Sequence, residues 1–330
     1  IRNLMNEPDL KHPVLFLFNG AEEMGLFGAH AFMQDSPYAE RVNAFVNLEA
    51  AGYGSRDFLF QSTNAWIMKE YTKVIKHPCG NAVGQDVFQG GIIPSDTDYR
   101  FFYGMKKQRI IHGVDSAFIK NGQWYHSYLD SMTTNGVSEI EIKQSIQYMA
   151  DNSGQLIRHL ALMDNSFDTS EVSNTRASYF DILNLVMVAY DVQSAKAYYY
   201  GLIAIALSIL LVQGWKSKQR FLLSLVVSLL TLTLSFVGGV AGSIGTAKIF
   251  ITALNAQMSW YAASPEYVLV LYGLPAIASS LLVYLVMILI FGNLISNRSM
   301  YGAALIFWSA LLLIGSRFNL GSTYLAALTL

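Results

Sequence analysis

The sequence predicts a protein of two parts: an α/β domain with a mostly parallel sheet and flanking helices, then an all-α transmembrane domain. Up to about residue 163, charged residues are spread through the chain and short apolar runs alternate with helical patterns. From about residue 198, the chain is apolar over stretches long enough to cross a bilayer. The mean hydropathy of +0.34 is the average of these two regions.

The first part contains the elements of an open α/β sheet. Strands are predicted where short apolar runs are bounded by turn residues: Val14–Phe18, Ala44–Leu48, Phe58–Gln61 and Val114–Ile119. Helices are predicted where apolar residues recur at helical spacing: Phe27–Met33, Ala65–Ile75 and Ser138 to about Leu162. Ser138 and Glu141 form a capping box at the start of the last helix.

The domain boundaries follow the change in composition. A polar linker is predicted from Asp164 to Ser178, and the apolar run Tyr179–Val186, interrupted by Asp181, is predicted to be an interfacial or packed segment. The chain begins at Ile1 and stops in apolar sequence, so we interpret it as a fragment cut at both ends. The predicted parts are residues 1–163 for the α/β domain, 164–197 for the linker and interfacial segment, and 198–330 for the transmembrane domain.

Four membrane spans are predicted, and the basic residues between them give a topology. Lys216, Lys218 and Arg220 lie between the first two spans, and Arg298 lies between the last two. By the positive-inside rule these loops are cytoplasmic, which puts the α/β domain on the lumenal or extracellular side. The sequon at Asn297 then stays unglycosylated, and a glycan there would overturn this topology. The spans are at about 198–212, 221–239, 268–291 and 301–314, and the first and last are short enough to extend into their flanks.

Composition excludes several classes of protein. The formal net charge is −1 and no basic stripe with interleaved aromatic residues is present, so nucleic acid is not an expected partner. The single cysteine forbids an intrachain disulfide and leaves the redox compartment open. The predicted spans hold no internal charge, which argues against a transporter with an ion relay.

The most informative stretch is the turn that carries Glu22 and Glu23, directly after the apolar run Val14–Phe18. Adjacent like charges repel each other. Metal-assisted hydrolysis requires such a pair, because one carboxylate binds a metal while the other moves a proton. The alternative is a solvated pair at the start of a helix, where the helix dipole favours acids.

Three further features accompany this pair. Glu49 follows a predicted strand, at the end where open α/β sheets place their sites, and an exposed loop acid is the alternative. Asp96 either belongs to the cap of a short helix or orients a ligand. His126, with Asp130 four residues later, is a candidate metal ligand held by an outer acid, and a structural or solvated histidine is the alternative. We interpret the other histidines as structural or solvated: His12, His30, His77, His112 and His159.

Four blocks occur in a fixed order: FLFNGAEE at residues 16–23, NLEAAG at 47–52, IIPSDTD at 92–98 and YHSYLD at 125–130. Together they resemble the two-zinc aminopeptidase and glutamate-carboxypeptidase superfamily, peptidase family M28. Apolar spans follow the blocks, and in this the chain is similar to the membrane-embedded endoplasmic reticulum metallopeptidase branch. The resemblance covers most of the α/β part and extends into the apolar part.

The resemblance implies a role for each matched residue. Glu22 matches the general base, Glu23 a ligand of one zinc ion, and Glu49 the acidic ligand of the other. His126 matches the histidine that shares a zinc ion with Glu23. Asp96 lies in a block that lines the family's site, and we expect it, like Asp130, to support the ligands. Two Zn²⁺ ions would lower the pKa of a bridging water, Glu22 would take its proton, and the hydroxide would attack a peptide carbonyl.

One departure from the family pattern limits this expectation. The family's remaining ligands, a histidine and a bridging aspartate, lie upstream of the Glu-Glu strand, where this chain has only residues 1–13. His12 is too close to that strand to serve. We therefore expect a zinc exopeptidase in the parent protein, anchored in the endoplasmic reticulum membrane with a lumenal peptidase domain, and an inactive fragment here. The alternatives are a non-catalytic lumenal interaction domain and a single-zinc glutaminyl cyclase. The amino- or carboxypeptidase type stays open.

Overall fold

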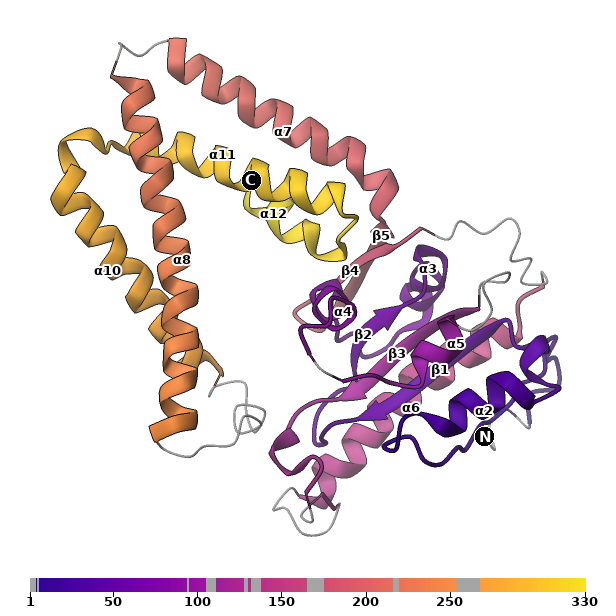
Figure 1. The fold of residues 1–330 in the computed structure, drawn as a ribbon. Helices are drawn as coiled ribbons and strands as arrows, with labels where there is room; N and C mark the ends of the chain where they lie inside the picture. Colours follow the sequence, from indigo (N-terminus) through magenta and orange to yellow (C-terminus); the bar gives the residue numbers. More distant parts are fainter. Residues whose placement is uncertain are drawn as a thin grey trace. The chain divides into compact units, whose positions relative to one another are not determined.

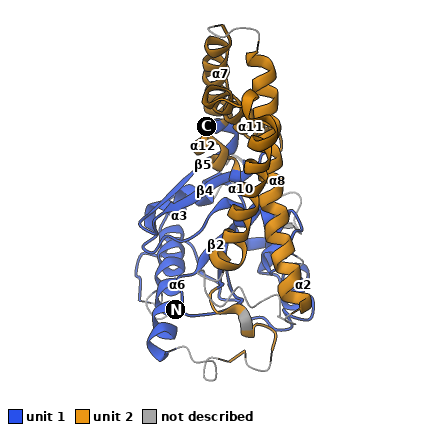
Figure 2. Ribbon diagram, turned by 90° about the vertical axis from the view of Figure 1, so that its left-hand side faces the viewer, with its two compact units in different colours: residues 1–119, 136–195, 319–322 blue, residues 120–135, 196–318, 323–330 orange. Residues whose placement is uncertain are grey.

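The computed structural model describes residues 4, 6–93, 95–104, 111–127, 130–131, 138–164, 175–215, 220–253 and 268–330. The chain forms two compact units, shown in different colours in Figure 2. Unit 1 comprises residues 1–119, 136–195 and 319–322, and unit 2 comprises residues 120–135, 196–318 and 323–330. Unit 1 holds the strands and short helices, and unit 2 holds most of the long apolar helices (Figure 1).

Unit 1 is built on a three-stranded sheet in the order β1-β3-β2. Strands β1 (Ala44–Ala50) and β3 (His112–Phe118) are parallel, while β2 (Phe58–Ser62) is antiparallel to β3. The α/β class and these three predicted strands are confirmed. The described sheet is mixed, because the connection from β1 to β2 is too short to hold the crossover helix that would make β2 parallel to β1.

The predicted helices of unit 1 are also present, with local signals that explain their ends. Asn64 caps α3 by accepting a hydrogen bond from the amide of Ile67. Ser138 and Glu141 make the predicted capping box at the start of α6. The three predicted helices are α2 (Phe27–Asp35), α3 (Ala65–Val74) and α6 (Glu139–Ala161). The structure adds α4 (Ala82–Gln89), α5 (Tyr99–Gly104) and a 3₁₀ turn at Ala39–Arg41, for which no bounds were predicted.

The predicted strand Val14–Phe18 was wrong. Among the described residues this segment pairs with no strand, and β1 pairs only with β3. The side chains of Leu15, Phe16, Leu17 and Phe18 are exposed, with Phe18 84% exposed. A strand depends on a neighbour for its backbone hydrogen bonds, so an apolar run without one stays irregular.

The predicted interfacial or packed segment within residues 164–197 contains a β-hairpin of β4 (Ala177–Ile182) and β5 (Val186–Asp191). Leu183 and Asn184 have φ of 52° and 56°, and the amide of Leu185 donates to the carbonyl of Ile182. Positive φ at both central residues is the geometry of a turn whose twist matches that of the strands, and in the register Ile182 pairs with Val186 across a three-residue loop. The acid that interrupts the run, Asp181, accepts a hydrogen bond from the backbone amide of Asn184 in this turn. Linker residues 165–174 lie outside the described residues.

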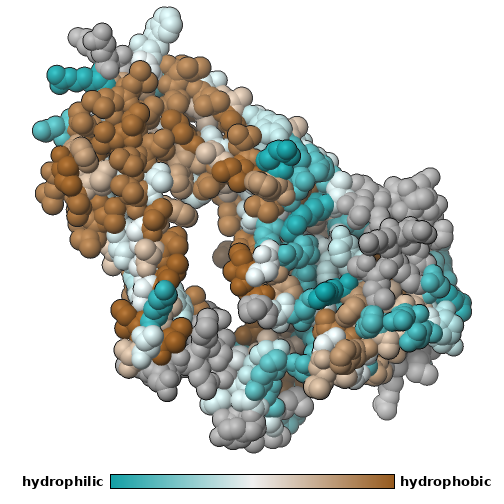
Figure 3. Space-filling model, in the orientation of Figure 1, coloured by the Kyte–Doolittle hydropathy of each residue, from teal (hydrophilic) through white to brown (hydrophobic). Residues whose placement is uncertain are grey.

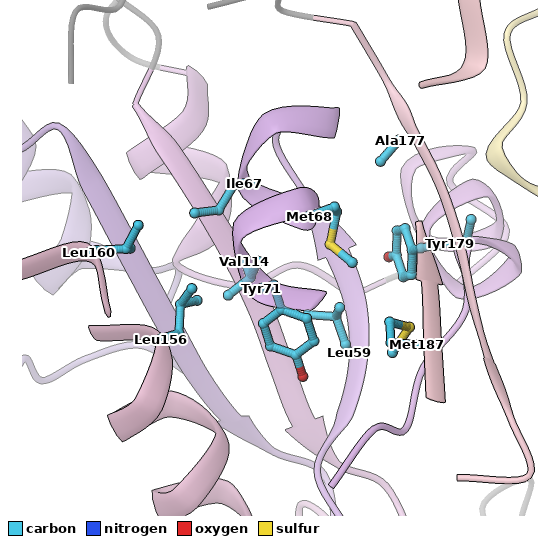
Figure 4. Packing of buried hydrophobic residues seen from close by; sticks show 11 residues of the cluster. Leu59, Ile67, Met68, Tyr71, Val114, Leu156, Leu160, Ala177, Tyr179 and Met187 are labelled. Atoms are coloured by element: carbon cyan, nitrogen blue, oxygen red, sulfur yellow. The ribbon is translucent and has the colours of Figure 1, made fainter. Parts of the chain in front are cut away.

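The core of unit 1 lies between α3, α6, the sheet and the hairpin (Figure 4). Tyr179 of β4 is fully buried, so the hairpin is an integral part of this core. Burial of large apolar side chains is the main force that holds these elements together. The buried members are Leu59, Ile67, Met68, Tyr71, Ala82, Val114, Leu156, Leu160, Ala177, Tyr179 and Met187.

Among the described residues, four helical stretches are long and apolar enough to cross a membrane, as predicted. The first and last extend beyond the predicted spans, and the surface of these helices is largely apolar (Figure 3). Two of the basic loop residues, Lys216 and Lys218, lie outside the described residues. The stretches are α7 (Val192–Trp215), α8 (Phe221–Ala253), Leu269–Leu294, which contains α10 (Leu274–Phe291), and α11 (Asn297–Arg317); α12 (Tyr324–Thr329) follows.

Small residues bring α8 and α10 into close contact within unit 2. A Cβ on Gly242 would lie 2.2 Å from the hydroxyl of Ser279, and one on Gly238 would lie 2.7 Å from Val283. Ser228 of α8 donates a hydrogen bond of 2.8 Å to Ser299 of α11. Small residues at such crossings allow apolar helices to approach closely.

We expect Leu156→Ala to destabilise the protein by about 2–5 kcal/mol, because Leu156 is fully buried in the core of unit 1 and no neighbour can fill the cavity completely. Chemical unfolding of the chain in detergent, followed by tryptophan fluorescence, measures the change. Ile140 lies on the same helix with 69% of its surface exposed, so Ile140→Ala serves as the control with a change within about 0.5 kcal/mol. Equal effects of the two substitutions would contradict this core.

Candidate active site

The Glu-Glu pair lies on a tight turn that leads into α2. The carbonyl of Glu22 accepts hydrogen bonds from the amides of Gly25 and Leu26, at 3.0 and 2.7 Å. Gly28 lies where a Cβ would come within 2.5 Å of the carbonyl oxygen of Gly20, so only glycine lets the turn pack on the helix. The side chain of Glu22 is half-buried and that of Glu23 is exposed. The sequence pattern of small residues around the pair therefore has a structural cause.

Glu49 lies at the carboxyl end of β1, as predicted for a site residue in an open α/β sheet. Its carboxylate accepts a hydrogen bond of 2.9 Å from Nδ2, the side-chain amide nitrogen of Asn47. The same nitrogen donates to Asp115 on β3 at 3.0 Å. Asn47 and Glu49 share a face of the strand because side chains alternate. One asparagine thus connects the site carboxylate to the interior of the sheet.

Asp115 is the centre of a buried polar row across the sheet. It lies opposite Asn47 on β1 and opposite Gln61 on β2 in the strand register. Gln61 donates to its carboxylate at 3.1 Å and the hydroxyl of Thr97 donates at 2.5 Å. Asp115 is fully buried, so these hydrogen bonds replace the water that it loses on folding. The sequence analysis missed this row, although two polar residues inside apolar strands signalled it.

The structure brings Asp98, and not Asp96, to Glu49. Asp98 is buried, and one of its carboxylate oxygens accepts a hydrogen bond from Asn19, next to the Glu-Glu turn. Its other carboxylate oxygen is buried and has no hydrogen-bond partner among the described residues. Asp96 instead pairs with Arg100 at 2.9 Å on the surface. The supporting role of Asp96 stays a prediction, and Asp98 is the stronger candidate.

Burial makes ionisation of the carboxylates at this edge of the sheet unfavourable. Burial raises the pKa of Glu49 to about 7, against the hydrogen bond from Asn47, and the nearby charges of Glu22 and Asp98 raise it further. Burial also raises the pKa of Asp98 and takes that of Asp115 to about 8. Acids crowded in this way are typical of functional sites, where a cation offsets their repulsion.

His126 and Asp130 belong to unit 2. The ring of His126 is exposed and stacks on Tyr125, with ring centroids 3.8 Å apart. Asp130 is exposed, and its amide donates to the carbonyl of Ser127 at 3.0 Å. The two intervening residues, Tyr128 and Leu129, lie outside the described part of the chain. Zinc binding by His126 and its support by Asp130 remain predictions.

The other histidines have structural surroundings in unit 1. His112 is fully buried against Trp66, with a hydrogen bond to Asn64, and burial lowers its pKa to about 4. Three other histidines lie within hydrogen-bond distance of an acceptor: His12 of the Met163 carbonyl, His77 of the Asp151 carboxylate and His159 of the Glu70 carboxylate. The ring of His30 packs against that of Phe101.

The site therefore fits a cation only in part. Glu49, Glu22 and the unpartnered oxygen of Asp98 offer carboxylate oxygens of the kind that bind metal ions. Within the described ranges, however, no three side chains of His, Cys, Asp or Glu are arranged to hold a metal ion. The described acids alone therefore do not make a complete metal site.

Comparison with known proteins identifies the α/β part. Residues 1–150 match the profile of peptidase family M28. The chain is 34% identical over 288 residues to human endoplasmic reticulum metallopeptidase 1, an alignment that covers 83% of this chain and 30% of the relative. It is 31% identical over 285 residues to the putative endoplasmic reticulum metallopeptidase 1 of Schizosaccharomyces pombe, covering 85% of this chain and 32% of that protein.

A second group of relatives carries a different name. The chain is 42% identical over 130 residues to a vacuolar membrane protease of Metarhizium robertsii, covering 39% of this chain and 12% of the relative. No solved structure matches the chain. In each comparison the chain spans about a third or less of the length of the curated relative.

We expect the metal-free protein to lose stability as the pH rises from about 4.5 to about 7. The raised pKa of Glu49 means that the folded state binds more protons than the unfolded state in this window, so deprotonation favours unfolding. Glu49→Gln removes this titration and keeps an oxygen for Asn47. Thermal unfolding in EDTA at several pH values tests the expectation. The melting temperature of Glu49→Gln should fall less with rising pH than that of the unsubstituted protein, and that of the exposed control Glu139→Gln should fall equally. The same pH dependence in the unsubstituted protein and both variants would contradict the expectation.

Proposed function

We propose that this chain, which belongs to peptidase family M28 through its residues 1–150, carries part of the active site of a membrane-anchored metallopeptidase. The observation that supports this most directly is the meeting of Glu22, Glu49 and Asp98 at the carboxyl end of β1. Peptide hydrolysis needs a base beside an electrophile, and a crowded acid set of this kind offers both the base and cation ligands.

Each acid has a distinct place in the proposed reaction. Glu22 is half-buried on a rigid turn, so it can take a proton from the attacking water and return it to the leaving amine. Glu49 is held by Asn47 and is the proposed metal ligand on the sheet side. Glu23 and His126 are the proposed ligands of the second zinc ion, and this role rests on the resemblance of their sequence blocks to the family. When bound, zinc ions would polarise the peptide carbonyl and acidify the water.

The relatives' names support a location as well as an activity. They are described as endoplasmic reticulum metallopeptidases and vacuolar membrane proteases, and the described part of this chain has four helices long and apolar enough to cross a membrane. We therefore assign the chain to the endoplasmic reticulum membrane as a multi-pass protein. The lumenal position of its α/β unit follows from the basic loops and is part of the proposal.

The upstream ligands of the family are the main condition on activity. Because residues 1–13 offer no matching histidine and aspartate, we propose that this chain alone binds zinc weakly and does not hydrolyse peptides. The full-length protein that contains it would supply them and bind two zinc ions. The proposed substrate is a peptide with a free terminus.

We expect Glu22→Gln in the full-length protein to lower kcat for peptide hydrolysis by about 10²- to 10⁴-fold while zinc content stays at two per chain, because the base is lost and the proposed ligands remain. Elemental analysis and a peptide-hydrolysis assay in detergent measure both. Glu49→Ala should lower the zinc content itself, and the exposed Glu139→Gln should change neither.

Three results would contradict the proposal. Full-length protein without zinc and without turnover would indicate a non-catalytic interaction domain. A single zinc ion with cyclisation of an N-terminal glutamine would indicate a glutaminyl cyclase. Two tightly bound zinc ions with turnover in this chain alone would show that the upstream residues are not needed.

A further inference from the structure

The segment that follows the fourth apolar helix is held in unit 1. Residues 319–322 lie between α11 and α12, yet they belong to the unit of the α/β elements. The amides of Gly321 and Ser322 both donate to the carboxylate of Asp86 on α4, at 3.1 and 2.7 Å. A carboxylate that accepts two successive backbone amides makes charge-assisted hydrogen bonds, which are stronger than neutral ones.

Asp86 is fixed in place by a cation. Its carboxylate also accepts a hydrogen bond from the guanidinium of Arg176, which directly precedes β4. Only 10% of the Asp86 side chain and 28% of the Arg176 side chain are exposed, so solvent screens this pair weakly. The carboxylate is therefore oriented before it receives the two amides.

A second group of contacts recognises Gly321 itself. The hydroxyl of Ser178 on β4 donates to the carbonyl of Gly321 at 2.6 Å. A Cβ on Gly321 would lie 2.7 Å from the Cβ of Ala82 and 3.0 Å from the carbonyl oxygen of Ala177. The site thus binds the amide and the carbonyl of this residue and leaves no room for a side chain.

The start of the first apolar helix is fastened at the same place. The amide of Val192, the first residue of α7, donates to the carbonyl of Arg176 at 3.0 Å. The side chain of Gln193 donates to that of Asn319 at 3.1 Å. Arg176 therefore connects the chain that enters the first apolar helix with the chain that leaves the fourth.

We propose that Asp86, Arg176 and Ser178 form a docking site on the α/β unit for the segment Asn319–Ser322. Unit 1 is then attached to the membrane helices at two points, the covalent junction before α7 and this docked segment after α11. The proposal does not depend on the peptidase activity.

The docking site also restricts the membrane topology. A segment bound to unit 1 lies on the same side of the bilayer as unit 1, so the chain between Asp191 and Asn319 must cross an even number of times. The four candidate spans in that interval satisfy this condition. Hydrogen bonds thus give a topological constraint that is independent of the basic loops.

Cross-linking in membranes tests the docking site. In a Cys79→Ser background, which removes the only native thiol, Gln193→Cys and Asn319→Cys are joined by a short bifunctional methanethiosulfonate. Asp86→Ala should lower the yield about tenfold or more, because two charge-assisted hydrogen bonds are lost. Gly321→Val should lower the yield as well, because its side chain would clash with Ala82 and Ala177.

The matched control is Asp35→Ala, which removes an exposed acid on α2 and should leave the cross-linking yield unchanged. Unchanged yields in both Asp86→Ala and Gly321→Val would overturn the docking site.

A labelling experiment keeps the proposal testable if those variants fail to fold. A membrane-impermeant maleimide is applied to single-cysteine proteins in sealed vesicles. Asn319→Cys should react from the same side as Lys69→Cys on α3 and from the opposite side to Arg220→Cys. Reaction of Asn319→Cys from the side of Arg220→Cys would overturn the proposal.

Discussion

The buried carboxyl of Asp115 is the constraint on which the site depends. It lies on the middle strand of the sheet, and the hydrogen bonds that it accepts come from both neighbouring strands and from the loop before α5. Loss of any donor would leave a desolvated acid in the sheet, which is costly. The same row fixes Asn47, and Asn47 fixes Glu49. The position of the Glu49 carboxylate is thus set by hydrogen bonds that begin at Asp115 in the interior of the sheet.

The acids next to this row, Glu22, Glu49 and Asp98, lie in an arrangement that is unfavourable for ionisation of Glu49 and that the proposed metal ion would stabilise. Glu49 lies near Glu22 and Asp98, and their charges make ionisation of Glu49 less favourable. A stable fold without a function would not gather these groups, whereas a cation would offset their repulsion. Asn19 connects Asp98 to the Glu-Glu turn, so the turn, the loop before α5 and the end of β1 act as one structural group.

Much of this arrangement could be predicted from the sequence, and the failures have physical reasons. Glu49 and the Glu-Glu turn follow local patterns, and the apolar helices follow from composition. The remaining differences depend on strand pairing, which the sequence does not specify. Val14–Phe18 has the composition of a strand but no partner strand among the described residues. The run from Tyr179 to Val186 pairs within itself as a hairpin, because Leu183 and Asn184 adopt positive φ. Asp98 was passed over for Asp96 because the two acids differ only in which one the fold buries.

In the proposed function, the acids around Glu49 at the carboxyl end of β1 provide ligands to a metal ion. The most direct measurement is an experimental structure of the full-length protein with zinc, using the anomalous signal to locate the metal. The account predicts a zinc ion about 2.0–2.2 Å from a carboxylate oxygen of Glu49, with Glu22 beside it. Zinc bound elsewhere, with Glu49 bonded only to protein groups, would contradict it.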